Sequence, residues 1–447
     1  MNRRIRTVLI FAVILLPSLH FVWKNRDMPQ FDYLHDDGVL FVSAKSLANN
    51  TYRIVSLPET PYQTQFPPLY PLYLSTVWRL NPDFPGNLRL ASLFNWLALA
   101  VYLALAWAFY RQSGMKEGKT WLLVALLAVN PYILWISSFL LSDVLFSCWL
   151  LATLLVAVRS GVRAALLAGV LGGLAYLSRT AAIALLIAVP GCMLWKREGR
   201  RAVAFAGGML PAVIGWGWWT RTHVSRSEDL TTIFYTDYIR YLMHTTLHDM
   251  PVILWKNVDE LLYSIGSMVL PRIYPSLPVK ILTEVIAVAV ITGTVRLVRR
   301  RFGVEYAMYA LVSAGILLVC NFLTTERYIV PLFPLLLAGL AEELAHIARM
   351  FRSAFRHKDR SQRVAAGLMS AVAAAVLLAA AGLQLFMSFQ FLPQTAGEKR
   401  AKLGDQQSAY TWIKANLPPS ATILSYEDPL LYLYTGHRGN HRPLDPL

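Results

Sequence analysis

The chain of 447 residues is poor in charged residues and in cysteine, and each shortage excludes a class of protein. Charged residues make up only 15% of it, whereas a soluble domain carries about a quarter. With 56% hydrophobic residues as well, the composition excludes an ordinary soluble protein. Cys148, Cys192 and Cys320 all lie inside apolar runs, so we expect free, packed thiols and no disulfide.

Long apolar runs recur along the chain, and about eleven of them are candidates for membrane-spanning helices. They cover residues 5–23, 91–110, 120–137, 143–158, 163–178, 180–195, 202–219, 279–297, 304–322, 328–344 and 364–386. No small-x-small cleavage site follows the first run, so we interpret it as a retained span. The pattern predicts an all-α polytopic membrane protein with about eleven transmembrane helices.

The net charge of +16 is divided among short loops that all fall on one side of these spans. These loops read RQSGMKEGK, RSGVR, KREGRR, VRRRFG and ARMFRSAFRHKDRSQR. The positive-inside rule therefore predicts a cytoplasmic N-terminus, with loops 24–90 and 220–278 and the C-terminus on the external face. Because the charge is not gathered on one soluble surface, we expect no nucleic-acid partner.

We expect two domains, a transmembrane domain over 1–390 that includes both external loops and a short extracytoplasmic segment over 391–447. In that segment AYTWIKANL predicts a helix, ATILSY a strand and DPLLYLYTGHR a second helix, which together form a small α/β tail. Long loops on one face and short linkers on the other favour chemistry at the external face.

Two adjacent acids, Asp36 and Asp37, open the first external loop helix in FDYLHDDGVLFVSAKSLANN. One of them could cap the helix, where a carboxylate suits the free N–H groups and the positive dipole end. Two acids exceed what a cap needs, and each raises the proton affinity of the other, which suits a general base. His35 could complete a divalent metal site with them, although no other residue nearby has ligand spacing.

Further candidates lie at the external ends of the apolar spans. Asp143 opens one span and either caps it or has a function, since burying a lone carboxylate is costly. The stretch YQTQFPPLYPLYLSTVW, which contains Tyr70, predicts an extended turn before any helix restarts. Arg179 in LSRT, and Arg327 beside Tyr328 in TTERYIVPLFPLLL, either snorkel to the interface or bind a phosphate.

The order of these motifs resembles the GT-C glycosyltransferases, most nearly the protein O-mannosyltransferase and aminoarabinose transferase superfamily. The resemblance rests on the first span, the acidic pair, PPLYP, the Asp-led fourth span, LSRT, ERYIVPLFPLLL and the tail WIKANLPPSATILSYEDPLLYLYTGHR. It implies a GT-C-type fold in a bacterial inner membrane. The implied reaction is inverting transfer of a sugar from a polyprenyl-phosphate donor to a hydroxyl of a lipid, protein or glycan, without a covalent sugar–enzyme intermediate.

The resemblance also implies roles for individual residues. Asp36 matches the first acid of the family's Asp-Glu pair and is expected to be the general base, supported by Asp37. Asp143 and Tyr70 are expected to orient donor or acceptor. The residues expected to bind the lipid phosphate are Arg327, Arg179, Arg53 and Tyr328.

One position departs from the family, because Gln65 and Phe66 stand where relatives often carry a lysine before the two prolines. One expected phosphate contact is therefore missing, and its role passes to the arginines. The resemblance implies no required cofactor, and a divalent metal is an open alternative.

Two other functions are compatible with the same residues. A transporter or flippase for lipid-linked glycans would also use interfacial arginines and acids, but it usually places its acids mid-membrane between related halves, and this chain shows no internal repeat. An O-antigen ligase or polymerase would carry basic residues in one late external loop. Here that loop contains Arg221, Arg226, Arg240, His244 and His248.

Overall fold

The computed structural model describes residues 3–225, 227, 230–237, 248–272, 276–320, 326–354 and 360–440. The first half contains α1 (Arg3–Lys24), α2 (Asp36–Ala48), α3 (Leu69–Leu80), α4 (Leu88–Gln112), α5 (Glu117–Ala128), α6 (Pro131–Ser137), α7 (Asp143–Ala157), α8 (Val162–Ser178), the 3-10 helix η1 (Thr180–Ile183), α9 (Ala184–Trp195) and α10 (Gly199–His223). The second half contains α11 (Leu230–Thr236), α13 (Met250–Ser267), α14 (Leu277–Arg299), α15 (Val304–Val319), α16 (Glu326–Ile329), η2 (Val330–Leu332), α17 (Phe333–Ala354), α18 (Arg360–Phe386), the π-helical η3 (Met387–Phe391), α19 (Leu392–Asn416) and α20 (Asp428–Thr435). The strands of the described part, β1 (Ile423–Leu424) and β2 (Gly439–Asn440), pair in parallel.

Six helices in the described ranges are long and apolar enough to cross a membrane. They are α1, α4, α10, α14, the helix that runs from α16 into α17, and the helix that runs from α18 into α19. A bent pair, α5 with α6, could form a seventh span, and the shorter apolar helices α7, α8, α9 and α15 occupy the other predicted runs. The all-α polytopic fold predicted from the hydrophobic runs is confirmed.

The bend between α5 and α6 has a local cause. Pro131 begins α6 and ends the preceding helix, because it cannot donate a backbone hydrogen bond. The side chain of Asn130 then caps α6 by accepting from the backbone N–H groups of Tyr132 and Ile133. The two helices meet at 55°.

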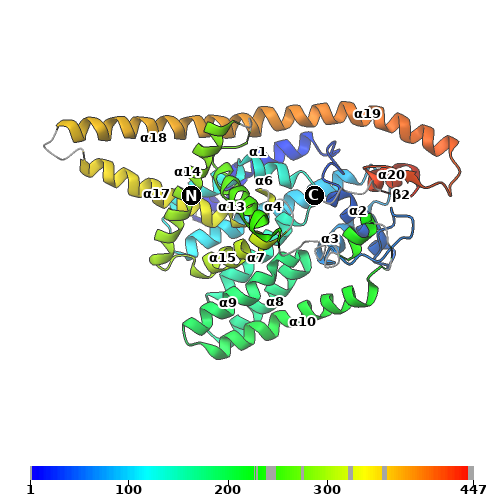
Figure 1. The fold of residues 1–447 in the computed structure, drawn as a ribbon, viewed down its shortest axis with the longest axis horizontal. Helices are drawn as coiled ribbons and strands as arrows, with labels where there is room; N and C mark the ends of the chain where they lie inside the picture. Colours follow the sequence, from blue (N-terminus) through cyan, green and yellow to red (C-terminus); the bar gives the residue numbers. More distant parts are fainter. Residues whose placement is uncertain are drawn as a thin grey trace.

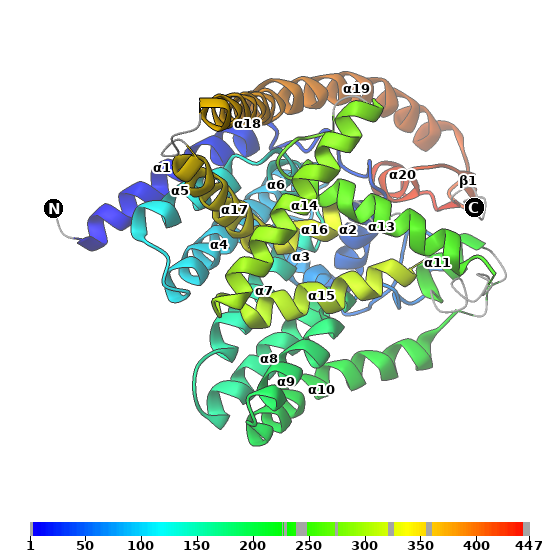
Figure 2. The same ribbon diagram turned by 60° about the vertical axis from the view of Figure 1, so that its left-hand side comes forward.

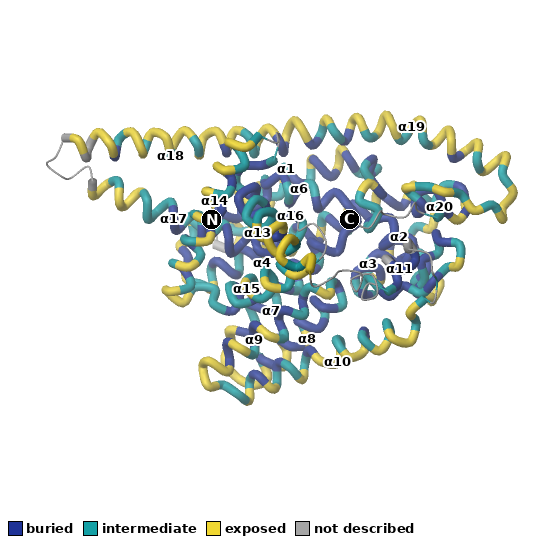
Figure 3. Tube along the Cα trace, viewed as in Figure 1, coloured by how far each residue is buried: buried dark blue, intermediate teal, exposed yellow. Residues whose placement is uncertain are grey.

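The longest helical element runs along one side of the molecule (Figure 1). There α18 continues through η3 into α19, so the expected domain boundary at residue 390 falls inside a continuous helix. Figure 3 shows that the tube of α18 and α19 is largely exposed, while the centre of the bundle is buried. Leu368, Val372 and Leu378 of α18 are exposed apolar side chains, as a lipid-facing surface requires. The three cysteines are free, as predicted.

Helices α2 and α20 and the small sheet lie together at one end of the bundle, opposite the ends of α17 and α18 that face each other (Figures 1 and 2). The turn expected around Tyr70 is wrong in one respect, because α3 already begins at Leu69 and includes Pro71. Proline is tolerated in a first helical turn, where its missing N–H would have no partner. The side chains of Phe41, Tyr70 and Leu430 share one buried cluster, which packs α20 against α2 and α3.

Candidate active site

Four charged side chains, three from helices and one from the junction of α8 and η1, meet and form what we call the ion network: Asp36, Asp143, Arg327 and Arg179. The Arg327 guanidinium bridges two acids, donating from Nη1 to Asp36 Oδ2 at 2.5 Å and from Nε to Asp143 Oδ2 at 2.9 Å. Arg179 Nη1 donates to the second oxygen of Asp143, Oδ1. Candidates that are far apart in the sequence are thus in direct contact.

Asp143 does not cap its helix, because Ser142 holds the N-cap position and makes no capping hydrogen bond with its side chain. The Asp143 side chain is completely buried, and each of its oxygens accepts from one arginine. A buried carboxylate is tolerable when it is paired and hydrogen-bonded in this way. The alternative of a simple cap is therefore wrong for Asp143.

The capping alternative is also wrong for Asp36 and Asp37, which are the first two residues of α2 itself. The N-cap is His35, whose side chain makes no capping bond. The Asp36 side chain is 24% exposed and contacts Arg327, whereas Asp37 is fully buried and its Oδ2 accepts from the Asp32 backbone N–H at 3.0 Å. Burial, with the nearby charge of Asp36, raises the pKa of Asp37 to about 7.

Tyr328 stacks on an arginine of the ion network, whereas Tyr70 hydrogen-bonds a residue outside it. The guanidinium of Arg179 lies over the ring of Tyr328, 4.8 Å from its centroid. Tyr70 is completely buried, and its hydroxyl donates to Asn95 Oδ1 at 3.4 Å. Asn95 in turn donates to the backbone carbonyl of Phe139, so Tyr70 helps to hold α4 and the chain before α7 in place.

Arg53 makes its contacts within the segment that links α2 to α3, and none of those described below involves the ion network. Its Nη1 donates to the Thr60 carbonyl at 3.0 Å, and its guanidinium lies 3.9 Å from the centroid of the Tyr62 ring. Tyr62 in turn packs edge-on against Trp219 of α10. Arg53 therefore stabilises the loop that covers α10.

His35 points away from the ion network, toward α20 and α11. Its Nε2 hydrogen-bonds Asp428 Oδ1 at 2.7 Å, and its Nδ1 hydrogen-bonds the Tyr235 hydroxyl at 2.5 Å. Burial lowers the pKa of His35, but Asp428 and the charges of Asp36 and Asp37 outweigh this and raise it overall. In the described part of the chain, no three His, Cys, Asp or Glu side chains come together as metal ligands.

A second, partly buried ion cluster adjoins the first, because Glu326 directly precedes Arg327. The Arg272 guanidinium forms an ion pair with Glu326, and its Nη1 donates to Glu260 Oε1 at 2.6 Å. Ser267 also donates to Glu326 Oε1, at 3.1 Å. These contacts hold the start of α16, and with it the backbone that carries Arg327.

The arginine and histidine candidates of the late loop do not gather in the part that the structure describes. Arg221 lies in the last turn of α10 and is exposed, and His248 is exposed ahead of α13. Arg226, Arg240 and His244 lie outside the described residues.

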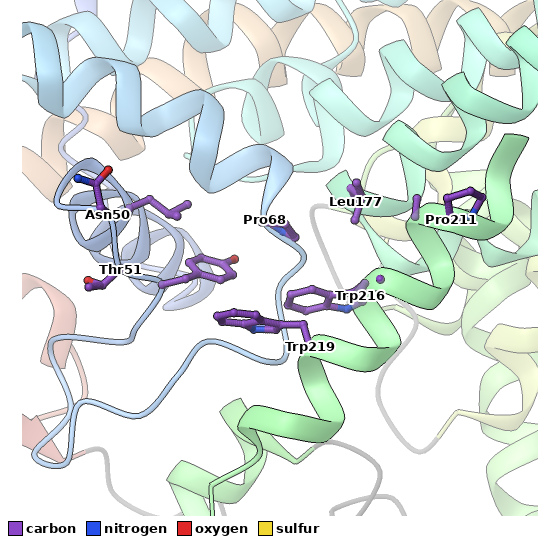
Figure 4. Close-up of a pocket in the computed structure, with 11 residues that line it drawn as sticks. Asn50, Thr51, Pro68, Leu177, Pro211, Trp216 and Trp219 are labelled. Carbon is purple, nitrogen blue, oxygen red and sulfur yellow. The ribbon is translucent and has the colours of Figure 1, made fainter.

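A cavity of about 510 Å³ lies between the segment that links α2 to α3, the end of α8 and α10 (Figure 4). Trp216 and Trp219 of α10 line one wall, and Asn50 and Thr51 lie on the loop side. The remaining lining residues are largely apolar: Leu47, Tyr52, Pro68, Leu177, Pro211, Ala212 and Gly215. Leu177, which lines this cavity, lies two residues before Arg179 in the chain.

No protein-family profile and no curated protein sequence matches this chain, whereas solved structures do match it. The crystal structure of ArnT from Cupriavidus metallidurans bound to undecaprenyl phosphate is 16% identical, with a TM-score of 0.60 over 98% of this chain and 86% of that chain. The apo structure of the same protein is 16% identical, with a TM-score of 0.51 over 91% of this chain and 80% of that chain. The chain therefore has the GT-C membrane fold of ArnT, as the order of its motifs predicts.

Proposed function

We propose that the protein is an inverting membrane glycosyltransferase of a bacterial inner membrane, which moves a sugar from a polyprenyl-phosphate donor to a hydroxyl acceptor on the external face. The observation that carries this proposal is the ion network. In it a partly exposed carboxylate, Asp36, pairs with Arg327, and Asp143 joins Arg327 to Arg179. The likeness in fold to ArnT, solved with undecaprenyl phosphate, supports a lipid-phosphate donor.

The reaction is a direct displacement at the anomeric carbon. Asp36 accepts the proton of the acceptor hydroxyl as its oxygen forms the new bond to that carbon. The bond from the anomeric carbon to the phosphate oxygen breaks, and the phosphate leaves with the electron pair and a further negative charge. Arg327 and Arg179 stabilise that charge, and attack from the opposite face inverts the anomeric configuration.

Asp36 is paired with Arg327, and this pairing provides a means of activation. A donor phosphate that takes over the Arg327 Nη1 group would displace the Asp36 carboxylate from its 2.5 Å contact. The released carboxylate is then available as a base only when the donor is bound. Asp143, which keeps both arginines in place with its two oxygens, is expected to remain bound throughout.

The apolar cavity beside Trp216 and Trp219 suits the first isoprene units of the donor. A chain lying there would enter from the membrane and place its phosphate near Arg179.

The test is sugar transfer in reconstituted vesicles supplied with a panel of polyprenyl-phosphate sugars, with release of free polyprenyl phosphate as the signal. The wild type should release it from at least one donor. Asp36→Asn should lose at least ~100-fold of that rate, since general-base catalysis contributes about 10²- to 10⁴-fold. Arg327→Lys should also be slow, because one ammonium cannot reproduce the two-directional contact of the guanidinium.

Asp83→Asn is the matched control, an exposed aspartate in the same external loop, and it should keep the wild-type rate. Normal turnover by Asp36→Asn would refute its role as the base. Passage of the intact donor across the bilayer without release would instead favour a transporter.

A further inference from the structure

The C-terminal helix α20 is joined to the start of α2 by buried polar contacts. Asp428, the first residue of α20, hydrogen-bonds His35 Nε2 at 2.7 Å, and the backbone N–H of Leu430 donates to Asp32 Oδ2 at 3.0 Å. The Asp32 backbone N–H donates in turn to Asp37 Oδ2. The side chain of Asp428 has no exposed surface, so this junction is interior to the protein and not a surface ion pair.

His35 has an unusual backbone conformation, with φ of 58° at the residue directly before Asp36. A residue with a side chain rarely adopts positive φ, and it stays there only when its surroundings hold it. The surroundings here are Asp428 on one ring nitrogen and the Tyr235 hydroxyl on the other. The imidazole is thus fixed from both sides.

The first turn of α2 is also packed tightly against α20. A Cβ atom added at Gly38 would lie 2.0 Å from Asp32 Oδ1 and 2.8 Å from Pro429 Cβ, so only glycine fits there. Asp36 therefore lies at the end of a turn whose position is set by α20. Its contact with Arg327, at 2.5 Å, depends on that position.

We propose that Asp428 is a positioning residue for sugar transfer, which holds the His35 ring from α20 and thereby keeps Asp36 in line with Arg327. The C-terminal segment is then a part of the active site and not an accessory to it. This inference rests on the proposed function of Asp36 as the base. A displacement of the base by about 1 Å can cost on the order of 100-fold in rate, so a residue that touches no substrate can still control turnover.

The test compares Asp428→Ala with wild type in the vesicle assay, using a donor that wild type turns over. Asp428→Ala should lower kcat by ~10- to 100-fold while KM for the donor, and the affinity for free polyprenyl phosphate, stay close to wild type. Asp428→Asn keeps an acceptor oxygen of the same shape and should recover most of the rate. Asp405→Ala, an exposed aspartate on α19, is the control and should behave as wild type.

A double-mutant cycle shows whether Asp428 acts through His35. If it does, His35→Gln combined with Asp428→Ala should be no slower than the slower single variant. Multiplied losses in the double variant, or a wild-type kcat in Asp428→Ala, would overturn the proposal. If Asp428→Ala does not reach the membrane, Tyr235→Phe removes the contact on the other ring nitrogen and should lower kcat in the same selective way; an unchanged kcat would also overturn it.

Failure of this proposal is distinguishable from failure of the proposed function. Without any release of polyprenyl phosphate by wild type, the transferase proposal itself fails. Release that depends on Asp36 but not on Asp428, His35 or Tyr235 leaves the transferase intact and removes only the positioning role.

Discussion

At the scale of single residues, Asp36 and Asp37 are neighbours in sequence but lie in opposite environments. Asp36 is partly exposed and contacts Arg327, whereas Asp37 is buried and its pKa is raised to about 7. The folded protein therefore holds the Asp37 proton more tightly than the unfolded chain, whose carboxyl titrates near the ordinary value of about 4. Between these two pKa values the unfolded state loses its proton first, so the free energy of unfolding falls as pH rises and levels off above pH 7.

Asp37→Asn should remove this contribution, which amounts to a few kcal/mol at most across the interval from about pH 4 to pH 7. An asparagine oxygen can still accept from the Asp32 N–H group, so the fold is preserved. The measurement is thermal unfolding in detergent from pH 4.5 to pH 8, where the variant should gain stability relative to wild type as pH rises. Parallel pH profiles for the two proteins would contradict the burial argument, and Asp83→Asn should parallel wild type.

The sequence singles out some residues of the site and not others, for a physical reason. A charged residue at the end of an apolar span is rare and costly, so Asp143, Arg179 and Arg327 are conspicuous in the sequence alone. Asp428 and Arg272 lie outside the predicted spans, and their partners His35 and Glu326 are distant in the chain. Only the tertiary contacts reveal them.

At the scale of helices, close packing between α8 and α10 depends on glycine at particular positions. A Cβ atom at Gly208 would lie 2.5 Å from the Leu166 carbonyl oxygen, whereas one at the adjacent Gly207 would meet nothing within 4 Å. Gly208→Val should therefore force the helices apart and cost about 1–3 kcal/mol of stability. Gly207→Val is the matched control on the same helix, and equal thermal unfolding of the two variants in detergent would refute the packing argument.

Hydrophobic runs predict the helices well, because each span must satisfy its own backbone and present apolar side chains to lipid. They do not predict how helices continue outside the membrane. The polar sequence of α19 (Leu392–Asn416) carries no apolar run, yet it extends α18 without a break through η3. The sequence does not reveal the start of α3 at Leu69, because the prolines around it are compatible with a first turn but do not require one.

At the scale of the whole molecule, the orientation in the membrane determines which face holds the chemistry. The ion network, α2 and α20 lie together at one end, and the facing ends of α17 and α18 lie at the other. The basic loops quoted above include the one that joins α17 to α18, and they are predicted to share its side of the membrane. The positive-inside rule therefore predicts that this end is cytoplasmic. The site would then face outward, on the side where the proposed donor is expected to be bound.

Single cysteines in a variant that lacks Cys148, Cys192 and Cys320 test this orientation in spheroplasts of a bacterial host. Asp405→Cys on α19 should react with a membrane-impermeant maleimide in intact spheroplasts, because its position is exposed and predicted to be external. Lys116→Cys, exposed between α4 and α5, should react only after permeabilisation. The reverse pattern would place Asp36 and Arg327 on the cytoplasmic face, and the acceptor would then have to be sought among molecules of the cytoplasm.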